Sequence, residues 1–379
     1  MLSMSEVQGP ERRGVGRPEQ GLGLKTERLR AEDADGVARA AELLRAGGTV
    51  AFPTETVYGL GANALDAAAV EKIFLAKQRP AWDPMIVHVE GRTMLQRVAA
   101  VPAGDEGRVV AKLIEAFWPG PLTLLLPRTA AVPDAVTAGR ALVGVRMPAH
   151  AVALQLIRRA GVPIAAPSAN RFGGTSPTTA AHVLADLDGR IDAVLDGGAT
   201  SVGVESTVLD VGARAIYRPG AVTAAMIAEA IGEEVRAVAG AGVVEEEADS
   251  SAALRNDKQG GLSDDRGAGL ASPGMGMRHY APRARLVLVA GQEEMLREVA
   301  NRAADEVGVM LPDGWNAGGA GAVFRWGAWD DAETLARRLF AGMRTLDARG
   351  VKAIVCPMPE MSGMGEALRD RLGKAARAK

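Results

Sequence analysis

The sequence contains few of the residues on which several common protein classes depend. Its 379 residues include one cysteine, and aromatic residues make up 4%. A single cysteine excludes an internal disulfide and fits a reducing compartment. Cys356 lies in the apolar run KAIVCPM, so we expect a buried thiol rather than a nucleophile. With so few aromatics, the cores must be built mainly from Ala, Val, Leu and Ile, which suits helices packed on strands.

Membrane segments and a secretory signal are also lacking. No run approaches the roughly 18 uninterrupted apolar residues that a membrane-spanning helix requires. Residues 1–5 are followed by Gly, Pro, Arg and Glu rather than by an apolar stretch. We therefore expect a cytoplasmic protein with no membrane contact.

Several catalytic signatures are missing as well. There is no GxxxxGK[ST] phosphate loop, no G-x-S-x-G elbow and no close spacing of His and Cys for a metal. The formal net charge is −2, so any contact with RNA or a nucleotide needs a local basic groove. What remains is Arg, Lys, Ser, Thr and Asn near strand ends. That set suits nucleotidyl transfer, where catalysis is mostly positioning and charge stabilisation.

Composition divides the chain into four parts. Residues 1–26 are rich in Gly, Arg and Glu and are predicted to be disordered. Residues 27–234 alternate helical and strand patterns and predict an α/β domain. Residues 235–283 read as a linker, mobile around 240–270, where periodicity is lost. Residues 284–379 predict a small, doubly wound, Rossmann-like α/β domain.

Hydrophobic periodicity places the elements within both domains. The predicted helices cover residues 33–45, 67–76, 105–117, 149–160, 178–187, 222–231, 293–305, 331–346 and 366–376. The predicted strands cover residues 49–53, 85–89, 122–126, 142–146, 162–166, 193–196, 206–211, 215–218, 285–289, 307–311 and 353–358.

Polar residues follow the first predicted strand and the helix after it. The run PTETVYGLG at 53–61 stands where ligands bind in α/β sheets, or it is a turn capped by Thr54 and Thr56. Lys77 and Arg79 are two cations one residue apart at a helix end. They predict a phosphate clamp, or they are a solvated helix C-terminus.

Two further candidates lie on apolar strands. His88 is surrounded by apolar residues, and a lone strand histidine is more often structural. Arg146 ends the strand VGVR, where an arginine usually holds an acid. That acid is either a carboxylate of the protein or one of a substrate.

Small residues after the strand 162–166 predict an anion cradle. In the run APSAN at 166–170, backbone amides can approach a phosphate while Ser and Asn complete the cradle. Ser176 either joins that cradle or caps the next helix. Arg218 ends another strand. His279 and Tyr280 form an aromatic pair in a Pro/Gly-rich segment, which is unusual unless it covers something.

Taken in order, these motifs resemble a known family. PTETVYGLGANA, KxRPxxxP, WPGPLT, VRMP, APSANxxGxxSPT, GxESTVxD and RPGAV resemble the YrdC-like threonylcarbamoyl-AMP synthases. SPGMGMRHYAPRA, LFAGMRTLD and GMGEALRDRLGKAA are similar to the linker and C-terminal domain of its long form. The resemblance implies a YrdC-type open, twisted α/β sheet with a positively charged concave face, followed by the small α/β domain.

The resemblance also implies a reaction. L-threonine, bicarbonate or CO₂, and ATP with Mg²⁺ would give threonylcarbamoyl-adenylate and pyrophosphate. A downstream threonylcarbamoyl transferase complex would then modify the adenosine beside the tRNA anticodon, and the basic groove would offer a contact for tRNA.

Carried over motif by motif, the resemblance implies two groups of site residues. The threonine pocket would comprise Thr56, His88, Arg146, Ser206 and the backbone near Ala166. The ATP site would comprise Lys77, Arg79, Asp83, Leu142, Ser168, Asn170, Ser176, Arg218 and Tyr280. Lys77 and Arg79 would act catalytically by neutralising charge that develops on the phosphates.

Two residues depart from the family pattern. Asp83 stands where the family more often has Asn, and a carboxylate there would repel phosphate unless Mg²⁺ lay between them. Gln78 stands where the family often has Gly.

Other functions remain as alternatives. A groove that held double-stranded RNA by its backbone would make the chain a binding module without ATP turnover. A carbamoyl-phosphate-using enzyme of hydrogenase maturation would carry cysteine-rich zinc-finger segments, which a single Cys argues against. An inert first domain serving a regulatory second one conflicts with the intact motif set.

Overall fold

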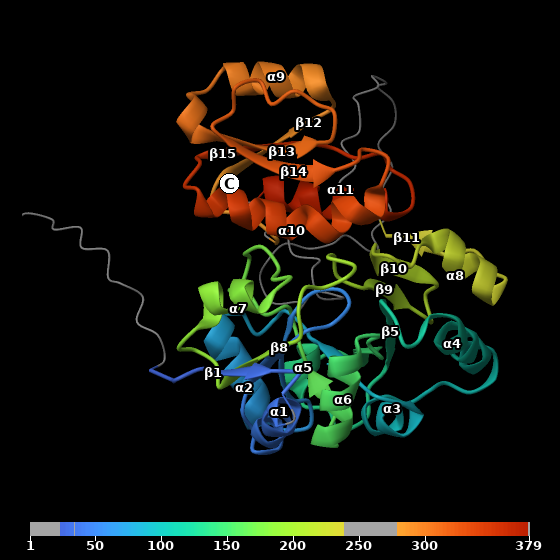
Figure 1. Cartoon of the computed structure of the whole chain (residues 1–379). Helices are drawn as coiled ribbons and strands as arrows, with labels where there is room; N and C mark the ends of the chain where they lie inside the picture. Colours follow the sequence, from blue (N-terminus) through green and yellow to red (C-terminus); the bar gives the residue numbers. More distant parts are fainter. Residues whose placement is uncertain (1–22, 34, 239–278, 378–379) are drawn as a thin grey trace, which may run out of the picture.

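The computed structural model describes residues 23–33, 35–238 and 279–377. It contains two α/β units, one above the other in Figure 1. The first is built on an 11-stranded sheet and the second on a four-stranded sheet. The predicted fold class is therefore confirmed. Residues 1–22 of the expected disordered segment, and the expected mobile stretch 240–270, lie outside the described residues.

The sheet of the first unit is mixed. Its order is β1-β8-β2-β3-β7-β4-β6-β5-β9-β10-β11. The strands are β1 Glu27–Arg30, β2 Val50–Phe52, β3 Gly59–Asn63, β4 Ile86–His88, β5 Leu122–Pro127, β6 Leu142–Arg146, β7 Ile164–Ala165, β8 Ala193–Asp196, β9 Thr207–Asp210, β10 Ala215–Arg218 and β11 Arg236–Ala237. The last strand extends the sheet past residue 234, where the sequence indicated that the domain ends.

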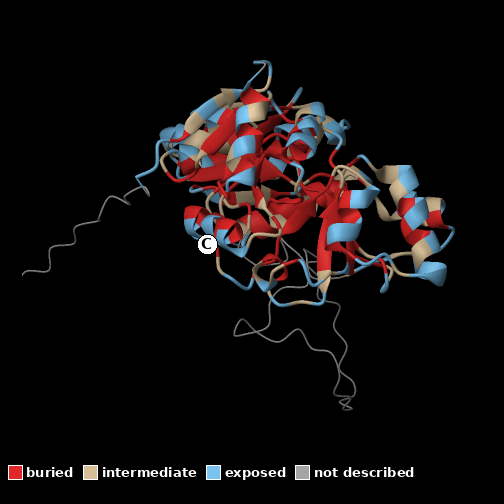
Figure 2. Cartoon of the chain, turned by 90° about the horizontal axis from the view of Figure 1, so that it is seen from below, coloured by how far each residue is buried: buried red, intermediate tan, exposed pale blue. Residues whose placement is uncertain are grey.

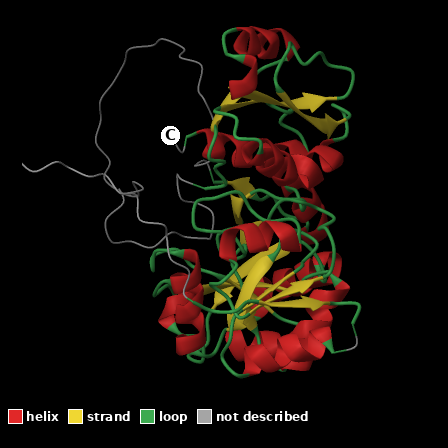
Figure 3. Cartoon of the chain, turned by 60° about the vertical axis from the view of Figure 1, so that its left-hand side comes forward, coloured by secondary structure: helices red, strands yellow, loops and turns green. Residues whose placement is uncertain are grey.

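Helices α1, α2 and α6 lie on the side of this sheet away from the second unit (Figures 1 and 3). The helices are α1 Gly36–Arg45, α2 Ala67–Lys77, α3 Arg92–Val98, α4 Gly104–Phe117, α5 Asp134–Thr137, α6 Ala151–Ala160, α7 Ala180–Leu187 and α8 Ala224–Ile231. In α1 the buried residues Val37, Ala40, Ala41 and Leu44 recur at helical spacing and form one apolar face. Loops occupy much of the side of the first unit that faces the second.

Helix α2 sets the positions of the first two predicted cations. The Asp66 carboxylate accepts hydrogen bonds from the backbone N–H groups of Ala68 and Ala69 and so caps the helix start. The helix ends at Gln78, whose φ of +54° is in the left-handed region that favours glycine. The turn points Lys77 into the protein and begins the segment that carries Arg79.

Helix α7 begins at Ala180, too far along the chain for Ser176 to be its capping residue. Its N-cap is Thr179, whose side chain accepts a hydrogen bond from the backbone N–H of His182. The alternative that Ser176 caps this helix is therefore wrong.

The second unit is a doubly wound parallel sheet. Its strands are β12 Arg285–Val289, β13 Val307–Pro312, β14 Ala322–Gly327 and β15 Ala353–Pro357, in the order β12-β15-β13-β14. Helix α9 Gln292–Ala300 covers the outer face, and α10 Ala332–Ala348 and α11 Met364–Ala376 face the first unit (Figure 1). A short 3-10 turn, η1 Ala304–Glu306, follows α9. Cys356 on β15 is buried as expected, and burial raises the pKa of its thiol.

Buried residues gather in the interior of the molecule, and exposed ones lie on its outer surface (Figure 2). One apolar cluster joins Val57 and Val204 of the first unit to Phe340 and Met343 on α10. Within the described ranges, no helix has both the length and the apolar character needed to cross a bilayer.

Candidate functional site

A pocket lies where loops of the first unit meet the segment that leads into β12. Nine of the residues predicted from the sequence line it: Thr56, Arg79, His88, Arg146, Ala166, Ser168, Ser206, Arg218 and Tyr280. They come from segments scattered between residues 56 and 280, so the fold has gathered them. Five other predicted residues do not line it: Lys77, Asp83, Leu142, Asn170 and Ser176.

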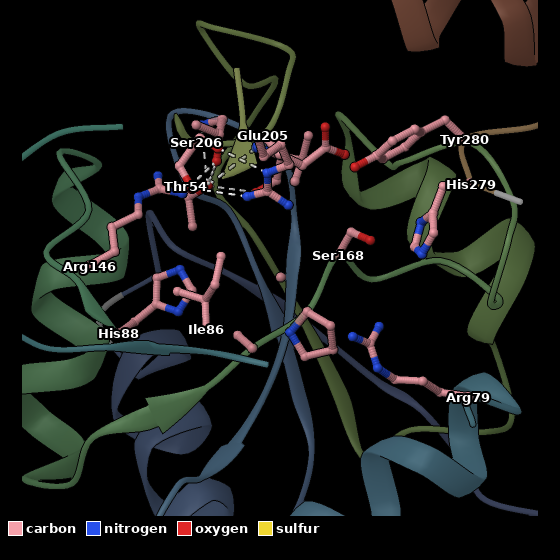
Figure 4. A pocket seen from close by; sticks show the side chains of 16 residues that line it. Thr54, Arg79, Ile86, His88, Arg146, Ser168, Glu205, Ser206, His279 and Tyr280 are labelled. Atoms are coloured by element: carbon pink, nitrogen blue, oxygen red, sulfur yellow. Dashed lines mark hydrogen bonds between the residues drawn. The ribbon is translucent and has the colours of Figure 1, made fainter. Parts of the chain in front are cut away.

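Arg146, at the end of β6, lies at one end of the pocket beside His88 (Figure 4). Its Nη1 donates to Thr56 Oγ1 over 2.9 Å and its Nε to the Gly120 carbonyl over 3.2 Å. Its Nη2 lies 2.7 Å from Glu55 Oε1, although the two groups are not aligned for a hydrogen bond. A protein carboxylate thus accompanies this arginine, and the guanidinium still borders the pocket.

His88 on β4 is almost fully buried and packs edge-on against Phe52, with ring centroids 6.0 Å apart. Burial, together with the nearby charge of Arg146, lowers the pKa of His88 to about 3. The imidazole is therefore neutral at physiological pH. A neutral imidazole can donate one hydrogen bond and accept another, but it carries no positive charge.

Ser206 lies between the two ends of the pocket (Figure 4). Its Oγ is 2.8 Å from Thr123 Oγ1 and accepts a hydrogen bond from Nη2 of Arg218 over 3.1 Å. The Nε of Arg218 also donates to the Ser206 carbonyl, over 3.0 Å. These bonds fix Arg218 at the end of β10 against the strand that Ser206 precedes.

Arg79 lies at the opposite end of the pocket from Arg146, near His279 and Tyr280 (Figure 4). Its Nη2 is 2.9 Å from Asp83 Oδ2 and donates to the Pro84 carbonyl over 2.6 Å. Asp83 is fully buried and also lies 3.6 Å from His279 Nε2. Burial, the largest single effect, would raise the pKa of Asp83, but Arg79, His279 and Lys77 together outweigh it and the pKa is lowered. Asp83 therefore neutralises Arg79 from behind and does not face the pocket.

Lys77 supports the pocket wall without lining it. Its Nζ donates to the carbonyls of Ser168, over 2.6 Å, and Asn170. Asn170 in turn donates to the Gly174 carbonyl over 2.8 Å. Burial, with a contribution from Arg79, lowers the pKa of Lys77. Lys77 and Asn170 thus shape the loop from which Ser168 reaches the pocket.

The other two predicted residues also lie behind the lining. Ser176 Oγ donates to Glu205 Oε1. Leu142 packs among Ile86, Leu125 and Val208. Each contacts a residue of the pocket wall, Glu205 in one case and Ile86 in the other.

Three polar lining residues were not predicted as site residues: Thr54, Glu205 and His279. Thr54 Oγ1 also donates to the Val57 carbonyl over 2.7 Å, so this threonine both structures the turn and borders the pocket. Glu205 stands in the GxESTVxD motif beside Ser206, and His279 precedes Tyr280, so adjacency was the available signal. Nothing in the local sequence indicates that Glu205 is held by Arg371, which lies 166 positions later.

The chemistry of the pocket is that of an anion site with a neutral histidine at one end. Arg79, Arg146 and Arg218 are all buried at its wall, whereas Glu205 is the one acid among the described lining residues. Within the described ranges, no three His, Cys, Asp or Glu side chains are grouped to hold a metal ion. A divalent cation would thus have to be carried mainly by oxygens of a ligand.

Comparison with known proteins gives matches to both units of the chain. The family described as "Telomere recombination" matches residues 42–220, and that described as "Threonylcarbamoyl-AMP synthase, C-terminal domain" matches residues 222–377. The chain is 42% identical to the threonylcarbamoyl-AMP synthase of Pyrococcus abyssi, over 89% of this chain and 93% of that protein. It is 41% identical to the enzyme of the same name from Bacillus subtilis, over 90% and 92%.

A solved structure matches across both units. The crystal structure of P. abyssi Sua5 complexed with L-threonine superposes with a TM-score of 0.78 at 38% identity, and the match covers 93% of this chain and 98% of that one. Since the relatives are matched over nearly their full length, the likeness includes both units. The chain belongs to the threonylcarbamoyl-AMP synthase family.

Proposed function

We propose that this chain makes threonylcarbamoyl-adenylate and pyrophosphate from L-threonine, bicarbonate or CO₂, and ATP. The observation that carries the proposal is the pocket itself. One end combines Arg146 with a neutral His88, and the other gathers Arg79, Ser168, Arg218 and Tyr280. The first end suits a small amino acid and the second suits a nucleotide.

At the threonine end, Arg146 would hold the substrate carboxylate through a charge-assisted pair of hydrogen bonds. Thr56 and Ser206 offer hydroxyl groups, and Ile86 and Ala166 offer apolar surface for the threonine methyl group. A neutral His88 does not repel the substrate ammonium group, whereas a charged one would. Support also comes from the P. abyssi structure, which was solved with L-threonine.

At the nucleotide end, Arg79 and Arg218 would neutralise phosphate charge and Ser168 would donate to a phosphate oxygen. Tyr280 belongs to the same wall and directs its hydroxyl group toward the other lining residues (Figure 4). We assign Lys77, Asp83, Asn170, Ser176 and Leu142 supporting roles, because each contacts a lining residue or its loop rather than the pocket. Mg²⁺ would be held by the phosphates of ATP, since it is commonly bound through substrate phosphates rather than by a protein cage.

The reaction can then proceed without a protein nucleophile. The threonine amine adds to CO₂ and releases a proton, which gives a carbamate. A carbamate oxygen forms a bond to the α-phosphorus of ATP while the bond to pyrophosphate breaks. The work of the protein is to hold the two substrates in line and to exclude water from the unstable carbamate.

The pocket must adjust to hold these substrates. Its cavity volume is about 50 Å³, which is room for only a few water molecules at about 10–15 Å³ each. ATP is far larger, so we propose that side chains at the rim turn outward when it binds.

The test is pyrophosphate release from ATP and Mg²⁺, measured with and without L-threonine and bicarbonate. We expect release that requires both. Release that is independent of threonine would point to another acceptor. Absence of release, with salt-sensitive binding of double-stranded RNA, would favour the binding-module alternative.

The wider setting is part of the proposal. We propose that the product passes in the cytoplasm to a threonylcarbamoyl transferase complex acting on tRNA. A groove between the units, lined by Arg171, Arg283, Arg344 and Arg349, offers a surface for tRNA. Its net charge is reduced by two lining acids, because Asp186 lies 2.6 Å from Arg344 and Asp347 lies 4.0 Å from Arg283.

A further inference from the structure

Arg371 reaches from the second unit to the wall of the pocket. It lies on α11 and its side chain is fully buried. Its Nε donates to Glu205 Oε2 over 2.8 Å, and its Nη2 donates to the Glu205 carbonyl over 3.3 Å. Its guanidinium carbon lies 5.3 Å from the centre of the Tyr280 ring. Glu205 and Tyr280 both line the pocket.

Glu205 poses a problem for a site that binds ATP. A buried carboxylate beside the triphosphate would repel it, and the repulsion is strong where water is excluded. Glu205 also attracts the guanidinium group of Arg218, the group that we propose binds the phosphates. Burial alone would raise the pKa of Glu205, but Arg371 and then Arg218 outweigh that effect, so the group remains an anion.

Four buried charged groups meet around Arg371. Three of them, Arg371, Lys374 and Asp370, belong to the second unit, and the fourth, Glu205, belongs to the first. Arg371 Nη1 donates to Asp370 Oδ2 over 2.6 Å, and Lys374 Nζ lies 2.8 Å from Asp370 Oδ1. Arg371 and Lys374 thus oppose Asp370 and Glu205. Removing Arg371 would leave a buried anion without its partner, which is costly.

Tyr280 is held by the same unit. Its ring stacks on Phe340 of α10 with centroids 5.7 Å apart, while Arg371 lies against the ring. The second unit therefore touches the pocket wall at two lining residues, through an ion pair and through an aromatic stack.

We propose that Arg371 is a positioning residue for the nucleotide end of the pocket. It neutralises Glu205 from the second unit, so that Arg218 is directed to the phosphates and Tyr280 is kept in the wall. The proposal rests on the function proposed above and makes the second unit a working part of the site.

The test replaces Arg371 by Met, which keeps much of the length of the side chain and removes the charge. We expect the KM for ATP, and the dissociation constant for ATP measured by calorimetry, to rise about tenfold or more. The KM for L-threonine should change by less than about twofold, since Arg146 and the residues that hold it belong to the first unit. The double variant Glu205→Gln/Arg371→Met should regain most of the affinity, because it removes the unpaired anion.

Arg337→Met is the matched control. Arg337 is an exposed arginine on the neighbouring helix α10, with a hydrogen bond to Thr334 of the same helix. We expect it to leave both KM values unchanged. Should Arg371→Met fail to fold, the double variant alone is compared with the wild type, and near-normal ATP affinity is expected.

The proposal is overturned if Arg371→Met binds ATP as well as the wild type, or if a folded double variant binds ATP no better than Arg371→Met. Where only the double variant folds, ATP binding at least tenfold weaker than that of the wild type also overturns it. The wild type, assayed in parallel, separates this outcome from the proposed function. If it releases no threonine-dependent pyrophosphate, the function fails, while the ATP titrations still decide the role of Arg371.

Discussion

The two ends of the pocket differ in where their support comes from. Thr56, His88 and Arg146 belong to the first unit, and the contacts that hold Arg146 come from Thr56, Gly120 and Glu55 of the same unit. At the other end, Tyr280 lies in the segment before β12 and contacts Phe340 and Arg371 of the second unit. The contacts that hold Arg146 therefore come from the first unit alone, whereas Tyr280 at the nucleotide end is held by side chains of the second unit.

The largest effect is expected from Asp83→Ala at the nucleotide end. Arg79 would remain buried without its carboxylate, and breaking a buried ion pair typically costs about 3–5 kcal/mol. We expect that loss in urea unfolding, with weaker ATP binding and with threonine binding retained in the folded fraction. Asp83→Asn should be milder because the amide keeps a hydrogen-bond acceptor. Unchanged stability in Asp83→Ala would show that Arg79 does not depend on Asp83.

Arg146→Ala should separate the two ends by their KM values, measured on the folded fraction because the change also leaves the buried Glu55 without its ion-pair partner. Loss of charge-assisted hydrogen bonds to the threonine carboxylate, worth about 1.5–3 kcal/mol, should raise the KM for threonine up to about 100-fold. The KM for ATP should stay within about twofold. Arg108→Ala, which alters an exposed arginine paired with Asp105, is the control. An equal rise in both KM values would contradict the division into two ends.

Acid should weaken the fold through His88 at the threonine end. The pKa of His88 is lowered from 6.5 to about 3, so between these values the unfolded chain takes up a proton that the folded chain does not. Stability should be unaffected above pH 6.5 and should fall with decreasing pH, by up to about 1.4 kcal/mol per unit from this residue. Urea unfolding at several pH values should show a shallower loss in His88→Gln. Parallel curves would mean that His88 can be protonated in place.

The smallest effect is expected at the turn before Arg79. Gln78 has a φ of +54°, a left-handed conformation that costs a residue with a side chain about 1–2 kcal/mol. Gln78→Gly relieves this cost, but the greater freedom of glycine in the unfolded chain offsets about 0.4–1 kcal/mol of the gain. We expect a slight gain in the free energy of unfolding with the KM for ATP unchanged, since the backbone path is kept. A loss of stability would mean that the Gln78 side chain makes contacts that offset the strain.

Much of the fold could be predicted from hydrophobic periodicity; α3 and β14 were missed although they carry apolar residues, and two other missed strands lack that signal. Strand β3 has the sequence GLGAN, whose small residues do not favour a strand, and it forms because β2 and β7 flank it. Strand β1, with the sequence ERLR, is a polar strand at the sheet edge. Helix α9 ends at Ala300 rather than residue 305, where a separate 3-10 turn follows.

The site residues that could be predicted are those at strand ends or within the ordered motifs. Arg79, Arg146 and Ser168 were found because each follows or ends an element that the pattern locates. The amine of Lys77 turns out to serve two backbone carbonyls, and Asp83 a buried arginine. Such pairings are set by tertiary contacts. The link from Glu205 to Arg371 spans two units, so no local pattern could indicate it.

The most direct test of the account is the identity of the nucleotide product. The protein is incubated with ATP, Mg²⁺, L-threonine and isotopically labelled bicarbonate, and the adenylate is analysed by mass spectrometry. We predict one product that contains AMP, threonine and the labelled carbon, and that is lost in Arg146→Ala. An adenylate that contains threonine without the label would contradict carbamate formation, and the absence of any threonine-containing adenylate would contradict the synthase itself.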